Sequence, residues 1–387
     1  KKIKMKKKLN IIHLASFRGN IGDLYSHSGL KFILDKVLFK KYSIKKLEWR
    51  EFYKNNTGKK KTFNSEFVRE INKYDLLVVG GGGYFDTSIS NSKTGTYFDI
   101  SKNIYNKIKI PVIFSSIGAI PFKNPPKNNL RKFKNFLQII KKKNHKIFLR
   151  NDGSKNYLDK VFSKEITKNI DEILDLAFFF CPADNKESQT LGNKKKYICI
   201  NLAPDQIELR KQDDNKIYLE RLMLNISKII EYSVLKMKYE VIFIPHAPQD
   251  VKIISKIFDL KTISKLRNNI AIAPLFYSDL NLNIIYNLYK NSEINICSRL
   301  HSNIISIISK NNHTIGLSFL KRIYYLSKSI KNEKNVIDIH DISLKNFKSH
   351  FKKLKNKENK KIYKMINIKK KETFLIYKKY LNQILNS

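Results

Sequence analysis

Tyr74-Asp-Leu-Leu-Val-Val79, followed directly by Gly80-Gly-Gly-Gly83, is the stretch that decides the fold of this chain. An apolar run of this length that ends in turn-forming residues is typical of a strand buried on both faces in a parallel sheet. Four successive glycines let the backbone approach a ligand closely, at a considerable cost in chain entropy. The residues interpreted as ligand contacts are Gly81, Gly82 and Gly83, followed by Tyr84 and Asp86 as contacts to hydroxyl groups.

The same order of strand, small residues and amphipathic helix recurs along both halves of the chain. Strands that alternate with helices predict a mostly parallel sheet with right-handed crossovers and helices on both faces. The other predicted strands are residues 9–14, 110–116, 146–150, 196–201, 240–245, 270–273 and 293–297, and the predicted helices include residues 130–140 and 218–236.

The length of the chain predicts two domains. Its 387 residues exceed the size at which a single hydrophobic core usually stops growing, and 42% of them are hydrophobic. We therefore expect an α/β fold with two Rossmann-like domains and a cleft between them. The predicted boundaries are 1–183 for the first domain, 194–345 for the second, and 346–387 for a basic C-terminal helical segment that packs back on the body. The polar stretch 181–193 is the predicted linker.

The formal net charge of +43 comes from 76 Lys and Arg against 33 Asp and Glu. Such an excess favours a polyanion partner or an anionic membrane surface. The lysines are spread along the whole chain beside Asn and Ile, however, which a general compositional bias also explains. No recognisable nucleic-acid-binding module is present, so nucleic acid is not an expected partner.

Several classes of protein are disfavoured by the sequence. No apolar run reaches the length of a membrane span, and no apolar segment follows the lysine-rich start, so we expect a cytoplasmic protein that can associate peripherally with the inner face of the membrane. The three cysteines are scattered and are expected to be reduced thiols. Dispersed histidines predict no metal site, and the absence of a GxSxG motif disfavours a serine hydrolase.

Candidate site residues follow the predicted strands. Ligands of open α/β sheets bind beyond the carboxyl ends of the strands. Five segments have this position, so two facing domains could bring several of them into one cleft: residues 19–23, 80–86, 150–154, 246–250 and 298–301. His246, in the fourth segment, is interpreted as an ordinary loop histidine.

Gly19-Asn-Ile-Gly-Asp23 offers unobstructed backbone N–H groups at the start of a helix, a common anion-binding arrangement. Gly19, Asn20 and Gly22 are therefore candidate anion-binding residues. The segment matches neither the Walker motif nor GxGxxG, so a generic tight turn is the alternative. Asp23 either caps the helix or positions and deprotonates a substrate hydroxyl.

Ile296-Cys-Ser-Arg-Leu-His-Ser-Asn-Ile304 places Arg299 and His301 two residues apart at the end of an apolar segment. An arginine fork matches the geometry of phosphate and carboxylate. Histidine can donate a proton near neutral pH. The pair thus suits an anionic substrate that must be protonated, the alternative being an ordinary strand-to-helix corner. Arg150, also directly after a strand, is either a second anion-binding residue or an ion-pair partner of Asp152.

Taken in order, five segments resemble the polysaccharide pyruvyl transferase family over roughly residues 9–330. They are Gly19-Asn-Ile-Gly-Asp23, Asp75-Leu-Leu-Val-Val-Gly-Gly-Gly-Gly83, Arg150-Asn-Asp-Gly-Ser154, Asp175-Leu-Ala-Phe178 and Ser298-Arg-Leu-His301, of which the last is the most specific. The resemblance implies a GT-B-like fold. It also implies transfer of an enolpyruvyl group from phosphoenolpyruvate to a sugar of a cell-surface polysaccharide or exopolysaccharide, or of its lipid-linked precursor, as a pyruvate ketal with release of phosphate.

The resemblance also implies roles for individual residues. Arg150 and Arg299 would bind the donor together with Ser298 and the first glycine loop, and no cofactor is expected. His301 would be the general acid, with Asp23 or Asp86 acting on an attacking oxygen. The family also has a lysine after the histidine, and in Gly316-Leu-Ser-Phe-Leu-Lys-Arg322 either Lys321 or Arg322 could fill its place. We choose Lys321.

The chain departs from the family pattern at two places. The Asp-Pro expected before that lysine is missing, and Asn151 stands where the family has an aspartate directly after arginine. Two other functions are therefore considered. One is a nucleotide-sugar glycosyltransferase of the same GT-B architecture, and the other is a non-enzymatic basic protein that binds membrane surfaces or polyanions.

Overall fold

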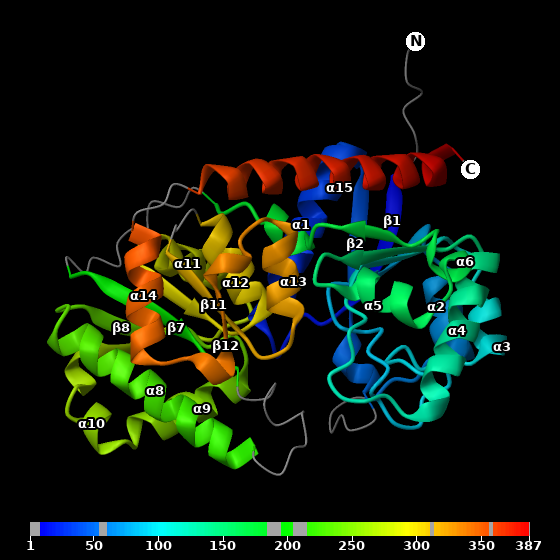
Figure 1. Cartoon of the computed structure of the whole chain (residues 1–387). Coiled ribbons are helices and arrows are strands. Elements are labelled where there is room, and N and C mark those ends of the chain that lie inside the picture. The colour runs from blue at the N-terminus through cyan, green and yellow to red at the C-terminus, as the bar shows by residue number, and fades with distance from the viewer. Residues whose placement is uncertain are drawn as a thin grey trace. The chain divides into compact units, whose positions relative to one another are not determined.

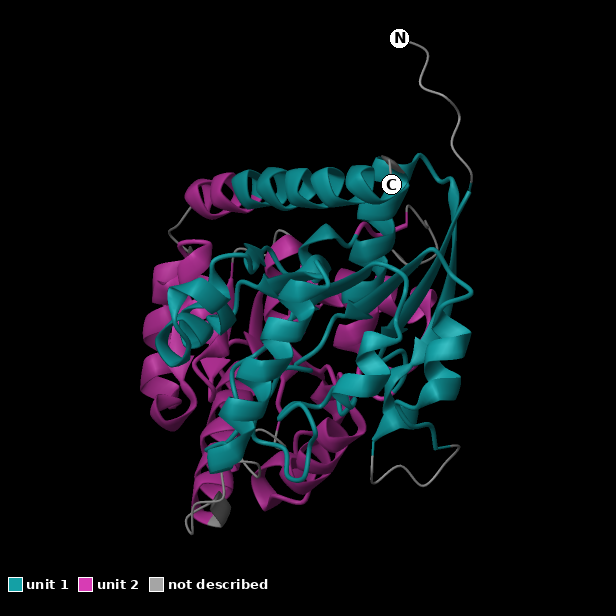
Figure 2. Cartoon of the chain, turned by 90° about the vertical axis from the view of Figure 1, so that its right-hand side faces the viewer, with its two compact units in different colours: residues 1–18, 26–180, 367–387 teal, residues 19–25, 181–366 magenta. Residues whose placement is uncertain are grey.

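The structure, a computed structural model, describes residues 8–53, 60–183, 195–203, 215–309, 313–355 and 359–386. The chain forms two compact units, shown in different colours in Figure 2. Unit 1 comprises Lys1–Arg18, Ser26–Phe180 and Asn367–Ser387, and unit 2 comprises Gly19–Tyr25 and Cys181–Ile366. Most of the predicted linker, from residue 184 to 193, lies outside the described residues.

Unit 1 is built on a parallel sheet of six described strands in the order β2-β1-β3-β4-β5-β6. Strands β1 and β2 are labelled in Figure 1. The strands are β1 (Leu9–Ala15), β2 (Tyr42–Glu48), β3 (Leu76–Gly80), β4 (Val112–Ile117), β5 (Lys146–Arg150) and β6 (Asp171–Ile173). The flanking helices are α1 (Ile21–Leu38), α2 (Ser65–Ile71), α3 (Lys102–Asn106), α4 (Lys127–Lys142), α5 (Ser154–Val161) and α6 (Lys164–Thr167), with 3-10 turns at Trp49–Phe52 and Leu176–Phe179.

The apolar pattern of the sequence explains the core of unit 1. Every residue of β3 is buried, as expected for a strand covered on both faces. In α4 the lysines alternate with a buried face that includes Phe133 and Phe136. These phenylalanines join an aromatic cluster, in which the rings of Phe85 and Phe133 lie 5.1 Å apart.

Unit 2 repeats the architecture with six described strands in the order β12-β11-β10-β7-β8-β9. They are β7 (Tyr197–Asn201), β8 (Glu240–Phe243), β9 (Ile270–Ile272), β10 (Ile294–Cys297), β11 (Thr314–Ser318) and β12 (Val336–Asp338). The helices are α8 (Asn215–Leu235), α9 (Pro248–Phe258), α10 (Lys261–Ser264), α11 (Asp279–Asn291), α12 (Leu300–Ile308), α13 (Arg322–Ser329) and α14 (Leu344–Lys355), with 3-10 turns at Arg267–Asn269, Glu333–Asn335 and Ile339–Asp341. Two parallel sheets with flanking helices confirm the predicted α/β class with two Rossmann-like parts.

The last helix, α15 (Lys360–Asn386), contributes its residues from Asn367 onward to unit 1. Its Thr373 hydroxyl accepts a hydrogen bond from the backbone N–H of Leu174 at 2.9 Å. The buried Tyr377 hydroxyl is hydrogen-bonded to the Ser115 hydroxyl on β4. These contacts anchor the basic C-terminal segment to the sheet of unit 1.

Two further predictions concern the chain as a whole. Within the described residues, no helix combines the length and apolar character needed to cross a bilayer. The cysteines carry free thiols, exposed at Cys181 and buried at Cys199 and Cys297. Burial raises the pKa of the Cys297 thiol to about 12, which keeps it protonated and unreactive.

Candidate functional site

The Ser298–His301 motif lies where β10 ends and α12 begins. Arg299 is the N-cap residue of α12, with extended backbone angles, and His301 lies in the first turn. The backbone N–H of Arg299 donates to the side-chain oxygen of Asn201, at the end of β7, at 3.0 Å. This contact fixes the corner against the neighbouring strand, so the positions of both side chains follow from the sheet.

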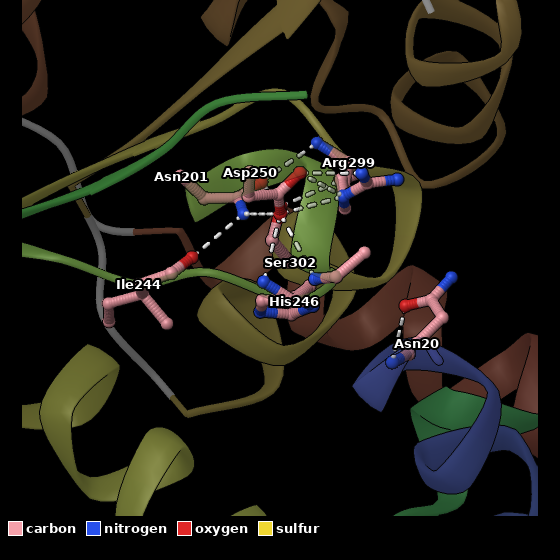
Figure 3. Close-up of polar contacts among 9 residues, drawn as sticks. Asn20, Asn201, Ile244, His246, Asp250, Arg299 and Ser302 are labelled. Carbon is pink, nitrogen blue, oxygen red and sulfur yellow. Dashed lines mark hydrogen bonds and ion pairs between the residues drawn. The ribbon is translucent and has the colours of Figure 1, made fainter. Parts of the chain in front are cut away.

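The Arg299 guanidinium forms a buried ion pair with Asp250 in the first turn of α9 (Figure 3). Nε lies 2.8 Å from Oδ2 and Nη2 lies 2.5 Å from Oδ1. Asp250 has no exposed surface and Arg299 is only 8% exposed. Charge-assisted bonds of this length in a water-excluded place hold the guanidinium in one orientation.

Asp250 also organises the loop before its own helix. Its Oδ2 accepts the backbone N–H of His246 at 2.9 Å and that of the N-cap residue Ala247 at 3.3 Å, the latter as in a capping box. The side-chain amide of Asn201 donates to the carbonyl of Ile244 at 2.8 Å, and its oxygen also accepts the Ser302 hydroxyl at 2.9 Å. The ends of β7, β8 and β10 are thereby joined in one polar network around Arg299 (Figure 3).

The first glycine loop packs against His301 within unit 2. The backbone N–H of Ile21 donates to the carbonyl of His246 at 2.8 Å. A Cβ atom at Gly22 would lie 2.3 Å from Nδ1 of His301, so only glycine fits here. The side-chain oxygen of Asn20 accepts the N–H of Gly22 at 2.9 Å and supports the turn. Residues 19–23 and the Ser298–His301 corner, predicted separately, are therefore neighbours.

His246 is a buried part of the same cluster. Its Nε2 is hydrogen-bonded to the Tyr289 hydroxyl at 3.1 Å. Burial, and after it the neighbouring Arg299 and His301, lower its pKa well below the usual value. The imidazole of His246 is therefore neutral at neutral pH and cannot be the proton donor.

Ser298 and the predicted lysine position complete the unit 2 candidates. Ser298 is buried, and its hydroxyl has no hydrogen-bond partner in the described part of the chain. Lys321 precedes α13 and is exposed, whereas the adjacent Arg322 is 8% exposed. Of the two candidates for the family lysine, Arg322 is thus the one in the interior of unit 2.

Arg150 ends β5 in unit 1 and lies between two buried carboxylates. Its Nε is 2.6 Å from Oδ2 of Asp152, and Nη1 is 3.9 Å from Oδ2 of Asp175. The guanidinium packs so closely on Gly118 that a Cβ atom there would lie 2.6 Å from Nη2. The ion pair between Arg150 and Asp152, one of the two roles predicted for Arg150, is therefore present. The Arg150 side chain is buried, with 4% of the residue exposed.

The second glycine loop also belongs to unit 1, where its polar neighbours have partners in the fold. The Tyr84 hydroxyl accepts the backbone N–H of Ser16 at 2.9 Å, and its ring stacks on Trp49 at 3.8 Å. Asp86 has no exposed surface and accepts the N–H of Ser88 at 2.8 Å. Gly81 has a φ of +88°, and Gly82 lies beside the Tyr84 ring, whereas Gly83 is partly exposed.

The predicted residues thus separate into two groups. Unit 2 holds Gly19, Asn20, Gly22, Asp23, Ser298, Arg299, His301 and Lys321, and unit 1 holds Arg150, Gly81, Gly82, Gly83, Tyr84 and Asp86. Two buried residues of the network had no role assigned from the sequence, Asn201 and Asp250. The only signal for Asp250 was its place just after a strand, at the start of a helix. Among the described residues, no three His, Cys, Asp or Glu side chains gather as a metal centre requires.

Comparison with solved structures finds similar folds over nearly the whole chain. UDP-GlcNAc 2-epimerase from Neisseria meningitidis is 12% identical, with a TM-score of 0.53 over 97% of this chain and 100% of that one. The enzyme of the same name from Methanocaldococcus jannaschii is 17% identical, with a TM-score of 0.52 over 93% and 98%. A glycosyltransferase from Rickettsia africae is 15% identical, with a TM-score of 0.51 over 97% and 99%. At such identities the likeness shows the fold alone.

The family follows from the sequence comparison. Residues 20–311 match the family model described as polysaccharide pyruvyl transferase, which is most of the chain. The chain belongs to the polysaccharide pyruvyl transferase family and is a transferase. None of the curated proteins matches it.

Proposed function

We propose that the chain transfers an enolpyruvyl group from phosphoenolpyruvate to a sugar of a cell-surface polysaccharide or its lipid-linked precursor. The product is a pyruvate ketal, and phosphate is released. The observation that carries this proposal is the juxtaposition, within unit 2, of the Arg299–Asp250 pair, His301 and the Gly19–Gly22 turn. It combines an oriented cation, an imidazole and a tight glycine turn at a helix start.

The first assigned step is proton transfer. His301 gives a proton to the methylene carbon of phosphoenolpyruvate, so that the adjacent carbon becomes an oxocarbenium-like electrophile. His246 is neutral because of its burial, which makes His301 the imidazole suited to this task in the unit 2 cluster. Contact between the His301 ring and Gly22 restrains its orientation.

The second step is bond formation at the electrophilic carbon. Two sugar hydroxyls add to it in turn, phosphate departs with the electrons of the C–O bond, and each hydroxyl loses its proton. Asp23, next to Gly22 in the first turn of α1, is assigned to orient or deprotonate an attacking oxygen, with Asp86 as the alternative. Tyr84 and the loop Gly81–Gly83 are assigned to acceptor contacts.

Donor binding is assigned to cations and N–H groups. Arg299 is held by Asp250 through Nε and Nη2, and its guanidinium is assigned to bind a carboxylate or phosphate of the donor. The buried hydroxyl of Ser298 is a further donor, since buried polar groups are normally hydrogen-bonded. Arg150 is proposed as a second anion-binding residue, and Lys321 or Arg322 as a third. No cofactor is required for this chemistry.

The experiment supplies phosphoenolpyruvate with nitrophenyl sugars and lipid-linked sugars as acceptors. We expect release of phosphate and addition of a pyruvyl mass to at least one acceptor. His301→Ala should abolish turnover and retain donor binding in calorimetry, whereas His350→Ala, on α14, should behave as the wild type. Absence of phosphate release across the panel, together with absence of phosphoenolpyruvate binding, would refute the proposal.

Arg299 needs a variant that separates binding from folding. Arg299→Ala should weaken both donor binding and turnover, but it also leaves Asp250 buried without its partner. Arg299→Lys keeps the charge and removes the bidentate fork, so donor affinity should fall while the protein still folds. Equal loss of thermal stability in Arg299→Lys and His301→Ala would indicate a structural corner instead.

The two alternative functions give different results in the same assays. A nucleotide-sugar glycosyltransferase should bind a uridine or guanosine diphosphate sugar, and phosphoenolpyruvate should not compete. A non-enzymatic protein that binds membranes or polyanions should keep its full binding affinity in the His301→Ala variant.

A further inference from the structure

Unit 1 contains a cavity at the end of its sheet opposite to Arg150. The cavity has a volume of about 660 Å³. Its lining comes from the beginning of β4 and β5, including Val112 and Lys146, and from the end of α15, including Lys379 and Tyr380. Every lining residue belongs to unit 1, so the cavity is a feature of this unit by itself.

Four lysine side chains line this cavity. The Nζ atom of Lys146 lies 4.8 Å from the centroid of the Tyr380 ring, and that of Lys379 lies 5.6 Å from the same centroid. Lys109 and Lys143 are two further lining residues with ammonium groups. An aromatic face attracts cations, but two ammonium groups at one ring also repel each other.

One neighbouring carboxylate, Asp171, interacts with both Lys146 and Lys379 and balances one of these positive charges. It also accepts a hydrogen bond from the Tyr380 hydroxyl at 3.3 Å. His145 is hydrogen-bonded through Nδ1 to the Tyr105 hydroxyl at 2.7 Å, and burial, then Lys143, lower its pKa to about 4. Burial also lowers the pKa of Lys146, the Asp171 carboxylate opposes this shift, and repulsion from Lys379 adds to it. A bound anion would relieve the repulsion.

Apolar side chains also line the cavity. They include Ile110, Pro111 and Ile384, each at least partly exposed. Pockets for small organic ligands typically measure about 300–1,000 Å³, so this volume holds more than an inorganic anion. A cavity lined by both lysines and apolar side chains fits a ligand with one anionic end and one apolar end.

We propose that this cavity binds a phosphate-bearing amphiphile, with the phosphate between Lys146 and Lys379 and the apolar part against Ile110 and Ile384. A membrane phospholipid and a free phosphate monoester of an apolar alcohol share this chemistry. The site is separate from the residues assigned to pyruvyl transfer, and its test does not depend on that activity.

The test uses the full chain and dihexanoyl phosphatidic acid below its micellar concentration, with binding measured by calorimetry. The double variant Lys146→Gln/Lys379→Gln should lose about tenfold or more in affinity, because two charged contacts are removed. Lys252→Gln/Lys256→Gln is the matched control. It makes the same change in net charge on the exposed face of α9 and should bind like the wild type.

Further arms separate the sources of the ligand. Inorganic phosphate should bind about tenfold more weakly or worse, since it lacks the apolar part, and Ile384→Glu should abolish binding of the lipid. Binding to phosphatidylcholine vesicles with one quarter phosphatidic acid, without binding of the monomer, would overturn the proposal in favour of diffuse surface charge. Equal affinity of the lysine double variant and its control, or of phosphate and the lipid, would also overturn it.

Discussion

Replacing Asp250 by asparagine should destabilise unit 2 strongly while leaving unit 1 intact. The carboxylate has no exposed surface, and the Arg299 Nε and Nη2 atoms lie 2.8 and 2.5 Å from its oxygens. Asparagine keeps the size of the side chain but removes the charge, so a buried guanidinium loses its partner. Breaking a buried pair in this way costs about 3–5 kcal/mol.

The single tryptophan allows the two units to be followed separately. Trp49 lies in unit 1, so its fluorescence should report the same urea midpoint in Asp250→Asn as in the wild type. Hydrogen exchange of the β10 and α12 amides should be faster by about two orders of magnitude, the equivalent of about 3 kcal/mol. Asp259→Asn, at the exposed end of α9, is the control and should change stability by less than about 0.5 kcal/mol.

A double-mutant cycle isolates the pairing itself. Combining Asp250→Asn with Arg299→Gln should cost less than the sum of the two single changes, by about 0.5–3 kcal/mol. Additive effects, or a loss below about 1 kcal/mol in Asp250→Asn, would refute the reasoning, because Asp250 would then not be stabilising a buried cation.

Three more changes test other parts of the structure. Gly22→Ala puts a methyl carbon 2.3 Å from Nδ1 of His301. This variant should therefore lower the free energy of unfolding by about 1–3 kcal/mol and slow phosphate release. Wild-type stability and turnover would contradict the contact. His13 and His27 are buried 2.9 Å apart in unit 1, and burial lowers their pKa values from 6.5 to about 3 and about 2. The unfolded chain therefore binds more protons below pH 6.5, so stability present above that pH is lost as pH falls toward 3. In the double variant His13→Asn/His27→Asn, the free energy of unfolding followed by Trp49 fluorescence should depend less steeply on pH, by up to about 1.4 kcal/mol per pH unit for each histidine. An unchanged pH dependence would contradict this expectation. Tyr377→Phe removes the hydroxyl that anchors α15 to the sheet and should lower the stability of unit 1 by about 1 kcal/mol in urea unfolding, whereas an unchanged midpoint would count against the anchor.

The interior strands could be predicted from the sequence because burial on both faces leaves a continuous apolar run. Strands β1, β3, β5, β7 and β10 all have this character. Strand β2 was missed because it lies at the edge of its sheet and carries Lys45 and Lys46 on exposed positions. The edge strands β6 and β12 have only three residues each, and β11 contains Gly316, which weakens its pattern.

The candidate site was predictable only as separate segments. Because sheet topology places strand ends together, the positions of Arg299 and His301 at such an end could be inferred. The hydrogen-bond partners of this corner could not be inferred, because Asp250 is 49 residues from Arg299 and Asn201 is 101 residues from Ser302. Pairing across such separations depends on which strands are neighbours in the sheet, and no local pattern encodes that order.

Phosphate release from phosphoenolpyruvate in the presence of a sugar acceptor, measured for the wild type and for His301→Ala, tests the central claim most directly. We expect the wild type to release phosphate and to add a pyruvyl group to the acceptor. His301→Ala should bind phosphoenolpyruvate and release none. Equal turnover by the two proteins, with the variant folded, would contradict the assignment of His301 as the proton donor.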